Sequence, residues 1–465
     1  MNLQEVQTAT GGSLSGGDAE FRAVSIDTRT LNEGDLFIAI SGPNFDGNDF
    51  VTTATKQNAC GAITSHEVNE GLPVLTVADT RKALGVIGAL NRTRTTACVI
   101  ALTGSQGKTT VKEMTADILS ECGNVMLTQG NLNNELGVPL SLARIEAEHE
   151  FAVIELGANG PGEIAYTAGL TRPRIGHITN IAETHLEGFG DLDGVARAKA
   201  EIWLSIEAGG IAVVNLDDEY ADQFIDQIRQ LGSGRKVVTV SGTGNKAADY
   251  QATEISLDSV NGSNFKLSSP VGEVVITLQV AGSHNVSNAL AAGAMAMSAG
   301  ASLDHVRAGL EKFLPVKGRM CVMPGLEGCT VVDDSYNASP ASFRAAIDVL
   351  SSTRATSDSP AHLPFHGRTV VVMGDMGELG NAAETAHREV GEYAREQSIN
   401  HFIAVGDLSR LAVEAFGEGG IFLKERSRFV DVIRPLLTKS TTVLVKGSRS
   451  QRMEQLVQQI KADME

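Results

Sequence analysis

The sequence predicts an α/β protein of three domains. Its 465 residues suffice for about three domains of ordinary size. From about residue 94 onward, short apolar runs alternate with amphipathic stretches, which is typical of mostly parallel sheets covered by helices. The 49 glycines suit the tight turns that such folds place at strand ends.

The first predicted domain, residues 1–93, is a small N-terminal α/β module. Its short β-like runs are broken by turns rich in Gly, Asn and Asp. The predicted strands are Leu36–Ile40, Ala62–Thr64 and Val74–Val77.

The second predicted domain, residues 94–315, opens with an apolar strand, a glycine-rich turn and a helix. The strand is Cys98–Leu102 and the helix is Thr109–Glu121. Further apolar strands are Phe151–Leu156, Ile175–Ile181 and Ile211–Asn215. We therefore expect a central domain with a mostly parallel sheet.

The third predicted domain, residues 316–465, repeats this alternation and is expected to be Rossmann-like. Its predicted strands are Thr330–Asp333, Thr369–Met373, His401–Val405 and Thr442–Val445. Amphipathic helices are expected at Ala341–Leu350 and Ala383–Ala394, and the polar tract Ser351–His362 is expected to be an exposed loop.

Composition excludes several classes of function. A net charge of -18 argues against nucleic-acid binding, which depends on basic surfaces. The N-terminus has neither the basic start nor the apolar core of a signal peptide, and no apolar run is long enough to span a bilayer. The five cysteines lack CxxC spacing, which predicts reduced thiols. We expect a cytoplasmic protein without membrane insertion.

The glycine-rich turn carries the clearest motif. It consists of Thr103, Gly104, Ser105, Gln106, Gly107, Lys108, Thr109 and Thr110. Glycines let backbone N–H groups approach phosphates, and the helix N-terminus favours negative charge. Lys108 is expected to reach the β- and γ-phosphates of ATP, and the Thr109 hydroxyl to bind Mg²⁺. Leu102 stands where the generic phosphate-loop (P-loop) motif has its first glycine, so the motif is a shortened form.

Two side chains beyond strand ends are candidate metal ligands. Glu155 ends the strand at 151–156, and His185 follows the strand at 175–181. Carboxyl ends of parallel strands are where sheet enzymes bind ligands. Alternatively, Glu155 caps a neighbouring helix, and His185 is a structural loop residue.

Three further groups each allow two interpretations. Lys199 lies in a predicted helix, and its periodicity alone favours a solvated lysine. Asn285 and Asn288, three residues apart on one helix face, can bind adenine with paired amides or cap the helix. Lys446 and Arg449 follow the last strand and suit a carboxylate or phosphate, or else belong to a solvated loop.

Taken in order, these motifs resemble the Mur ligase family over nearly the whole chain. The family's T-G-x-x-G-K-T loop also lacks the first glycine. Gly130–Pro139 and the Ser-Tyr-Asn-Ala segment within Asp333–Pro340 resemble the branch that adds D-alanyl-D-alanine, as do 374–380 and 446–449. One departure is visible, because Gly160 stands where that branch usually carries a histidine.

The resemblance implies a set of site residues. The catalytic residues would be Lys108, Glu155, His185 and Lys199, and the metal ligands Thr109, Glu155, His185 and a carbamylated Lys199. Beyond the loop, the nucleotide would contact Asn285, Asn288, Arg319 and Asp334. Substrate would contact Ser25, Thr28, Arg29, Asn44, Phe45, Asn131, Asn133, Asn134, Asn337, Lys446 and Arg449.

The resemblance also implies an activity. It predicts an ATP-dependent acid–D-amino-acid ligase of peptidoglycan synthesis, with ATP and two Mg²⁺ ions. A UDP-N-acetylmuramoyl-tripeptide would be activated as an acyl phosphate and joined to D-alanyl-D-alanine. Residues 1–93 would bind the UDP-sugar, 94–315 would bind ATP, and 316–465 would bind the amino donor and close over ATP. We expect a monomer.

Other functions stay open from sequence alone. One is a ligase of the same fold with another amino donor, including folylpolyglutamate-type enzymes. A second is a P-loop NTPase or kinase that performs no ligation, and a third is a non-catalytic binding protein. The sequence does not distinguish diaminopimelate from lysine in the tripeptide.

Overall fold

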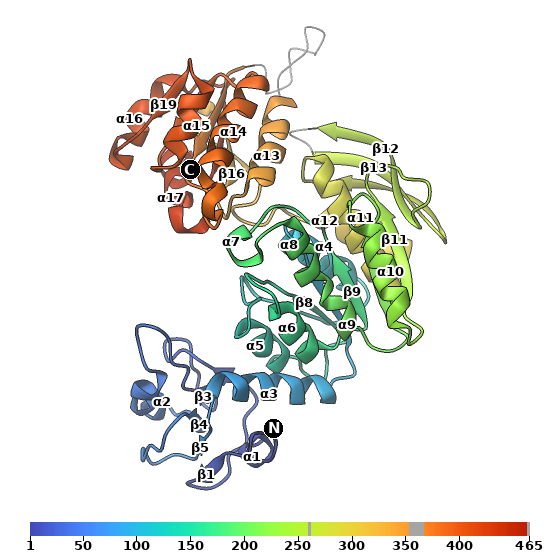
Figure 1. Ribbon diagram of the computed structural model, residues 1–465, viewed down its shortest axis with the longest axis vertical. Helices are drawn as coiled ribbons and strands as arrows, with labels where there is room; N and C mark the ends of the chain where they lie inside the picture. Colours follow the sequence, from blue (N-terminus) through green and yellow to red (C-terminus); the bar gives the residue numbers. More distant parts are fainter. Residues whose placement is uncertain (259–261, 353–366, 463–465) are drawn as a thin grey trace.

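The computed structural model describes residues 1–258, 262–352 and 367–462. Its strands form three separate sheets of five, nine and six strands, and the three units follow one another in chain order along the long axis of the molecule (Figure 1). The predicted three-domain α/β architecture is therefore confirmed.

The N-terminal sheet has the order β1-β5-β4-β3-β2. The strands are β1 (Ser13–Ser15), β2 (Val24–Ser25), β3 (Leu36–Ile38), β4 (Gly61–Thr64) and β5 (Val74–Thr76), with helices α1 (Leu3–Thr10) and α2 (Val51–Lys56). Only the pairing of β1 with β5 is antiparallel among these strands. Helix α3 (Thr80–Arg94) runs on to pack against helices of the next domain.

The central sheet has the order β14-β13-β12-β11-β10-β9-β6-β8-β7. Its strands are β6 (Cys98–Thr103), β7 (Val125–Leu127), β8 (Phe151–Glu155), β9 (Ile175–Ile178), β10 (Ile211–Asn215), β11 (Lys236–Ser241), β12 (Tyr250–Asp258), β13 (Gly262–Ser269) and β14 (Gly272–Leu278). The pairings from β7 to β12 are parallel, and those of β12 to β14 are antiparallel.

Helices cover both faces of the central sheet because successive side chains of its inner strands point to opposite sides. Ile100 and Leu102 of β6 pack with α4 (Lys108–Leu119), α11 (Ser283–Ser298) and α12 (Leu303–Lys312). Val99 and Ala101 pack on the other side. That side holds α5 (Gly137–Ala143), α6 (Glu163–Thr171), α8 (Leu192–Ala200), α9 (Ile202–Ser205) and α10 (Ala221–Leu231).

The C-terminal sheet has the order β15-β16-β20-β17-β18-β19, with only β15 antiparallel. Its strands are β15 (Cys321–Pro324), β16 (Thr330–Asp334), β17 (Thr369–Met373), β18 (His401–Ala404), β19 (Gly420–Phe422) and β20 (Thr442–Lys446). One face packs on α13 (Pro340–Ser352), α14 (Ala383–Glu396) and α15 (Ser409–Phe416), and the other on α16 (Phe429–Ile433) and α17 (Glu454–Ile460).

Every predicted strand corresponds to an observed one, although some end earlier. The strand expected at 175–181 ends at Ile178, and the one expected at 36–40 ends at Ile38. The tract 351–362 begins in α13, and its residues 353–362 lie outside the described residues. None of the described helices is both long and apolar enough to span a membrane.

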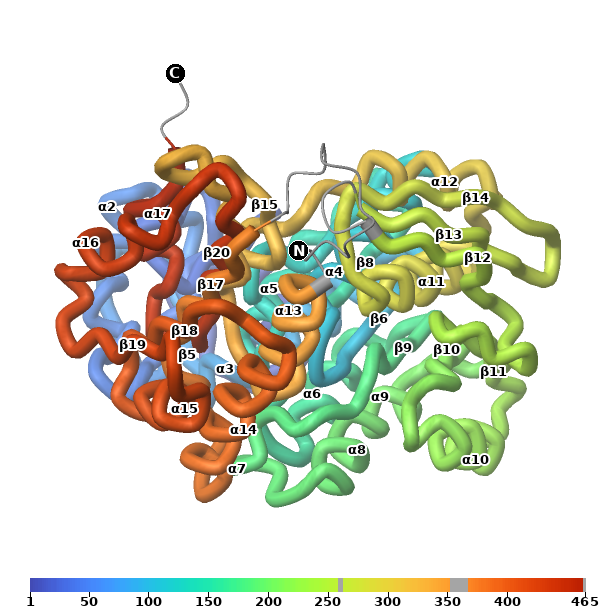
Figure 2. The backbone as a smooth tube through the Cα atoms, turned by 90° about the horizontal axis from the view of Figure 1, so that it is seen from above, coloured from blue at the N-terminus to red at the C-terminus, as the bar shows by residue number. Residues whose placement is uncertain are grey.

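The central and C-terminal domains lie side by side in both views. The short helix α7 (Leu186–Phe189) extends from the central domain toward the C-terminal one (Figures 1 and 2). It contacts the 3₁₀ turn η3 (Gly380–Ala382), which precedes α14. The glycine-rich turn lies at the same boundary.

Candidate active site

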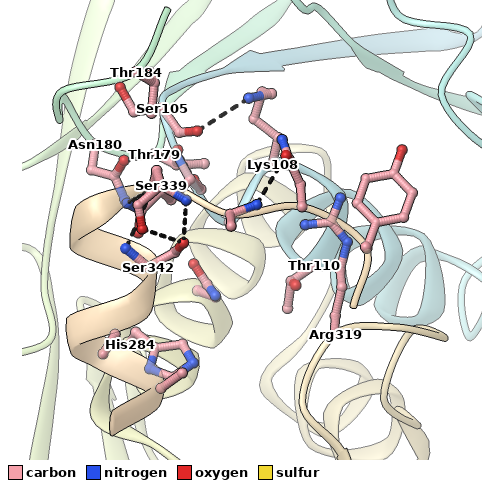
Figure 3. A pocket seen from close by; sticks show the side chains of 18 of the residues that line it. Ser105, Lys108, Thr110, Thr179, Asn180, Thr184, His284, Arg319, Ser339 and Ser342 are labelled. Atoms are coloured by element: carbon pink, nitrogen blue, oxygen red, sulfur yellow. Dashed lines mark hydrogen bonds between the residues drawn. The ribbon is translucent and has the colours of Figure 1, made fainter. Parts of the chain in front are cut away.

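A cavity of about 340 Å³ lies between the central and C-terminal domains, a volume within the range of small-molecule sites. Figure 3 shows Ser105, Lys108 and Thr110 of the central domain close to Arg319, Ser339 and Ser342 of the C-terminal domain. The predicted site residues that line it are Ser105, Gln106, Gly107, Lys108, Thr110, His185, Asn285, Asn288, Arg319, Asp334, Asn337 and Lys446.

Contacts from the end of β9 fix the shape of the loop between β6 and α4. Asn180 accepts the backbone N–H of Ser105 through its carbonyl (2.9 Å) and that of Gln106 through its side chain (2.9 Å). Gly104 has φ +145°, and an added Cβ would lie 1.8 Å from the Thr179 Oγ1. Only glycine fits there, which explains the motif physically.

Lys108, the first residue of α4, lies against the loop. Its Nζ donates to the carbonyl of Gly104 (2.7 Å) and to that of Ser105 (3.4 Å). Burial lowers the pKa of Lys108, although the Glu155 carboxylate opposes this effect. The cation therefore lies among the backbone groups expected to hold phosphate.

Thr109 and Glu155 form a buried cluster of oxygen atoms. The Thr109 hydroxyl donates to Glu155 Oε2 (3.0 Å), and the Asn133 amide donates to Oε1 (2.8 Å). Arg319 of the C-terminal domain donates to the Thr109 hydroxyl (3.0 Å). The partners of Glu155 are side chains, so the helix-capping alternative is wrong.

This cluster fits Mg²⁺. No group of three or more His, Cys, Asp or Glu side chains that could hold a metal exists within the described part of the chain. Mg²⁺ needs no such group, because it commonly binds one or two protein ligands and completes its shell with water and substrate phosphates. Thr109 and Glu155 supply two oxygen ligands of this kind.

Lys199 on α8 is buried, with 1% of its surface exposed. Its Nζ lies 5.8 Å from the Phe189 ring centroid, and no carboxylate or hydrogen-bond partner meets it within the described ranges. Burial first, and then the charge of Lys108, hold its pKa well below the usual range. The solvated lysine favoured by periodicity is therefore wrong.

His185 meets a carboxylate from the C-terminal domain. Its Nδ1 lies 2.5 Å from Oε2 of Glu378, and this hydrogen bond lowers the pKa of Glu378. The His185 ring also packs edge-on against Phe189, at 6.4 Å between centroids. Glu378 is absent from the predicted site residues, although the segment 374–380 resembled the family.

The two asparagines of α11 are buried beside the loop. The Asn285 amide donates to the carbonyl of Ala281 (2.7 Å), and that of Asn288 donates to Asn285 Oδ1 (3.2 Å). Neither side chain caps the helix, so the capping alternative is wrong. An added Cβ on Gly107 would lie 2.6 Å from Asn288 Oδ1, which places this amide next to the phosphate loop.

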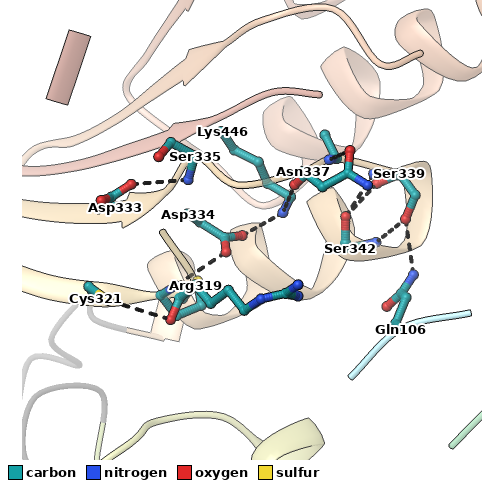
Figure 4. Close-up of polar contacts among 12 residues, drawn as sticks. Gln106, Arg319, Cys321, Asp333, Asp334, Ser335, Asn337, Ser339, Ser342 and Lys446 are labelled. Carbon is teal, nitrogen blue, oxygen red and sulfur yellow. Dashed lines mark hydrogen bonds and ion pairs between the residues drawn. The ribbon is translucent and has the colours of Figure 1, made fainter. Parts of the chain in front are cut away.

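In the C-terminal domain, buried Lys446 bridges two segments that line the cavity. Its Nζ contacts Asp334 Oδ2 at 2.5 Å and donates to the carbonyl of Asn337 at 2.9 Å (Figure 4). It is 3% exposed, so the solvated-loop alternative is wrong for Lys446. Arg449 has a side chain that is 62% exposed and pairs with Glu454, and its substrate role stays a prediction.

Comparison with known proteins gives the family. Three family models match the chain in order. Residues 20–92 match the model described as "Mur ligase family, catalytic domain". Residues 102–296 match "Mur ligase middle domain", and residues 318–449 match "Mur ligase, glutamate ligase domain". The UDP-N-acetylmuramoyl-tripeptide–D-alanyl-D-alanine ligase of Escherichia coli K12 is 42% identical over 98% of this chain and 97% of its own. The chain belongs to the Mur ligase family.

Other relatives and solved structures agree with this assignment. The ligase of the same name from Haemophilus influenzae is 38% identical over 96% of this Mur ligase and 94% of its own chain. MurF from Acinetobacter baumannii superposes with a TM-score of 0.88 at 36% identity, covering 98% of this chain and 97% of that one. MurF from Thermotoga maritima in complex with ADP superposes at 0.80 and 25% identity, covering 94% and 96%.

The expected UDP-sugar residues of this Mur ligase lie in the N-terminal domain, outside the cavity. Phe45 is 56% exposed beside Phe50, and Arg29 is paired with Asp27 at 2.6 Å. Ser25 is buried. Thr28 is half-buried and Asn44 exposed. The structure does not bring these residues to the phosphate loop.

The three asparagines before α5, which were also expected to contact substrate, have different surroundings. Asn133 joins the Glu155 cluster, whereas the Asn134 side chain accepts the backbone N–H of Gly137 at 2.9 Å and so stabilises the turn before α5. Asn131 is exposed. None of the three lines the cavity.

The turn that carries Gly160, where the resemblance led us to expect a histidine, is held by Glu201. This carboxylate accepts the backbone N–H of Gly162 (2.9 Å) and that of Ala165 (2.8 Å) at the start of α6. The turn touches α7, because an added Cβ on Gly188 would lie 1.8 Å from the carbonyl oxygen of Asn159. The departure leaves Lys108, Glu155, His185 and Lys199 in place.

Proposed function

We propose that this Mur ligase uses ATP to join D-alanyl-D-alanine to a UDP-N-acetylmuramoyl-tripeptide. The supporting observation is that the phosphate loop and the Asp334–Lys446 pair, from different domains, line one cavity. A site that transfers a phosphoryl group from ATP to a second substrate must bind both molecules next to each other, and a cavity between two domains can do so. The 42% identity to the E. coli ligase over 98% of this chain supports the choice of substrates.

The reaction has two steps. The terminal carboxylate of the tripeptide attacks the γ-phosphorus of ATP, which forms an acyl phosphate and releases ADP. The free amine of D-alanyl-D-alanine then attacks the acyl carbon, inorganic phosphate leaves, and the amine loses a proton to give the amide. Activation is needed because a carboxylate is a poor electrophile.

In the first step, residues of this chain position the reacting groups and neutralise the charge on the phosphates. These are the main requirements of phosphoryl transfer. Loop N–H groups and Lys108 hold the β- and γ-phosphates. Arg319 approaches Thr109 from the C-terminal domain at 3.0 Å, so domain closure adds a second cation beside the transferred group. Asn285 and Asn288 present amide groups for the adenine ring.

Thr109 and Glu155 would hold one Mg²⁺ ion, and His185 with the carbamate of Lys199 a second. When bound, these ions neutralise phosphate charge and orient the attacking and leaving oxygens. The carbamate forms when the neutral Lys199 amine adds to CO₂ and releases a proton. Burial without an acidic partner favours that neutral amine.

The domains are proposed to divide the substrates among them. Residues 1–93 bind the UDP-sugar, 94–315 bind ATP, and 316–465 bind the dipeptide. Closure of the last domain excludes water, which would otherwise hydrolyse the acyl phosphate. A cytoplasmic monomer is part of the same hypothesis.

Phosphate release by purified protein tests the proposed function. ATP, Mg²⁺, UDP-N-acetylmuramoyl-tripeptide and D-alanyl-D-alanine are supplied together, and each is then omitted in turn. Sustained release should require all four, and Lys108→Ala should abolish it. Release without the dipeptide would instead favour the NTPase alternative, and a different amino donor in its place would favour a sibling ligase.

A further inference from the structure

Glu378 is a carboxylate of the C-terminal domain that reaches a proposed metal ligand of the central domain. It follows β17 in the segment 374–380, and its Oε2 lies 2.5 Å from Nδ1 of His185. The two loops also approach each other beside this pair, because an added Cβ on Gly380 would lie 3.7 Å from the Cβ of Glu187. Both His185 and Glu378 line the cavity.

The backbone of both residues is strained in the same way. His185 has φ +52° and Glu378 has φ +62°, a left-handed conformation that non-glycine residues seldom adopt. Such conformations are energetically unfavourable and cluster at functional sites, where the surrounding structure holds them. Here two strained residues face each other across the domain boundary.

The contact determines which nitrogen of His185 carries hydrogen. An ionised carboxylate only accepts hydrogen bonds, so Nδ1 must be the donor to Glu378. In the neutral ring, Nε2 then has a free lone pair. Metal-binding histidines usually donate their other ring N–H to a carboxylate in this way, which fixes the tautomer and the ring orientation.

We infer that Glu378 is a positioning residue, which holds His185 with Nε2 free for the second metal ion and does so only when the C-terminal domain is in place. This inference rests on the proposed function, in which His185 is a metal ligand. Its consequence is that domain closure and metal binding favour each other, since the carboxylate and the imidazole come from different domains.

The competing explanation is that the contact only joins the two domains. In that case Glu378 would compete with the metal for His185, and removal of the carboxylate would strengthen metal binding. In a positioning role, removal would weaken metal binding. The two roles therefore predict changes of opposite sign.

The two possible roles of Glu378 are distinguished by titrating the full-length protein with Mn²⁺ in the presence of ADP and measuring the bound Mn²⁺ by electron paramagnetic resonance. Mn²⁺ serves as the probe because its ligand preferences resemble those of Mg²⁺. Glu378→Ala should weaken one class of Mn²⁺ site by about tenfold to a hundredfold. Glu378→Gln should weaken it less, because an amide oxygen still accepts from Nδ1. Glu392→Gln, an exposed glutamate on α14, is the matched control and should bind as the parent does.

His185→Gly shows whether a failure belongs to this inference or to the proposed function. Glycine tolerates the left-handed backbone and offers no side-chain ligand in place of the imidazole, and thermal unfolding checks that each variant is folded. Unchanged Mn²⁺ binding by His185→Gly would reject His185 as a ligand and the inference with it. If His185→Gly weakens binding and Glu378→Ala does not, or strengthens it, the positioning role alone is overturned.

A kinetic readout distinguishes positioning from a general structural defect. Glu378→Ala should raise the Mg²⁺ concentration needed for half-maximal activity, and saturating Mg²⁺ should restore most of kcat. A structural defect would lower kcat at every Mg²⁺ concentration, and that result would contradict the inference.

Discussion

Lys199 shows how burial changes the chemistry of a single residue. Its helix α8 packs on one face of the central sheet through Ala196 and Ala198, and the lysine side chain is buried with its amine near the Phe189 ring. An enclosed amine without an acidic partner favours its neutral form. The sequence pattern alone favoured a solvated lysine, because helical periodicity does not show which neighbours cover a helix.

Replacement of this lysine tests the carbamate directly. Lys199→Ala should lower ligase activity by at least about a hundredfold, in line with the loss of a metal ligand and its neighbours. Acetate or formate should restore part of it, because a short carboxylate can occupy the space of the carbamate. Phosphate release measures both effects. Full activity of Lys199→Ala would contradict a carbamate role.

The lowered pKa of Lys199 also predicts a dependence on CO₂. Only the neutral amine reacts with CO₂, so a lowered pKa extends carbamate formation to lower pH than an ordinary lysine allows. As the pH falls through that pKa, the amine protonates and the carbamate is lost. Activity in CO₂-free buffer should therefore fall most at acidic pH and return with bicarbonate. An absence of any bicarbonate response at every pH would count against this prediction.

At the level of elements, an ion pair links the carboxyl ends of β16 and β20. Asp334 and Lys446 are directly opposite in the parallel register, and their side chains form a buried ion pair. Breaking such a pair from one side leaves a charge without its partner in an apolar environment.

Substitution of the acid therefore has a predictable cost. Asp334→Asn should lower the free energy of unfolding by about 3–5 kcal/mol, measured by urea denaturation. The double variant Asp334→Asn with Lys446→Met should recover part of this loss, because no unpaired charge is left. If the single variant unfolds at the parent's urea concentration, the pair does not stabilise the domain.

The elements that sequence predicted well are those with continuous apolar runs. The strand at 98–102, its loop and its helix were recognised because burial on both faces produces an unbroken run and the loop needs glycine at fixed positions. The strands β12 to β14 were not expected. In β13 only Phe265 and Leu267 carry the buried apolar face, and a register shift between Thr253 and Ser256 interrupts the alternation in β12.

At the scale of the whole molecule, the site depends on packing between domains. The loop and Glu155 could be predicted because each lies at the carboxyl end of an apolar strand of one domain. Arg319 and Asp334 came only from resemblance, and the sequence alone left Lys446 open between a ligand site and a solvated loop, because the approach of these residues to the phosphate loop depends on how two domains meet. Glu378 could not be predicted as a site residue from the sequence, because its role depends on contact with His185, which belongs to another domain.

The same dependence predicts motion of residues 316–465 as a rigid body. Among the contacts that the described residues make between this domain and the central one are three polar pairs, namely Arg319 with Thr109, Ser339 with Gln106, and Glu378 with His185. All three lie at the cavity, so ligands that bind there gain contacts on both sides when the domains approach. The residues proposed to bind the UDP-sugar, in contrast, belong to the N-terminal domain, which lies at the other end of the molecule (Figure 1). Under that proposal the substrate would have to span the distance from the N-terminal domain to the cavity.

We expect small-angle X-ray scattering to detect this closure. A non-hydrolysable ATP analogue with Mg²⁺ and the UDP-tripeptide should reduce the radius of gyration, and either ligand alone should reduce it less, because each completes only part of the boundary. Lys108→Ala, which should bind the nucleotide poorly, is the control and should change little. An unchanged radius of gyration with both ligands bound would mean that the two domains are already at their working separation, and that water is excluded by the ligands themselves rather than by closure.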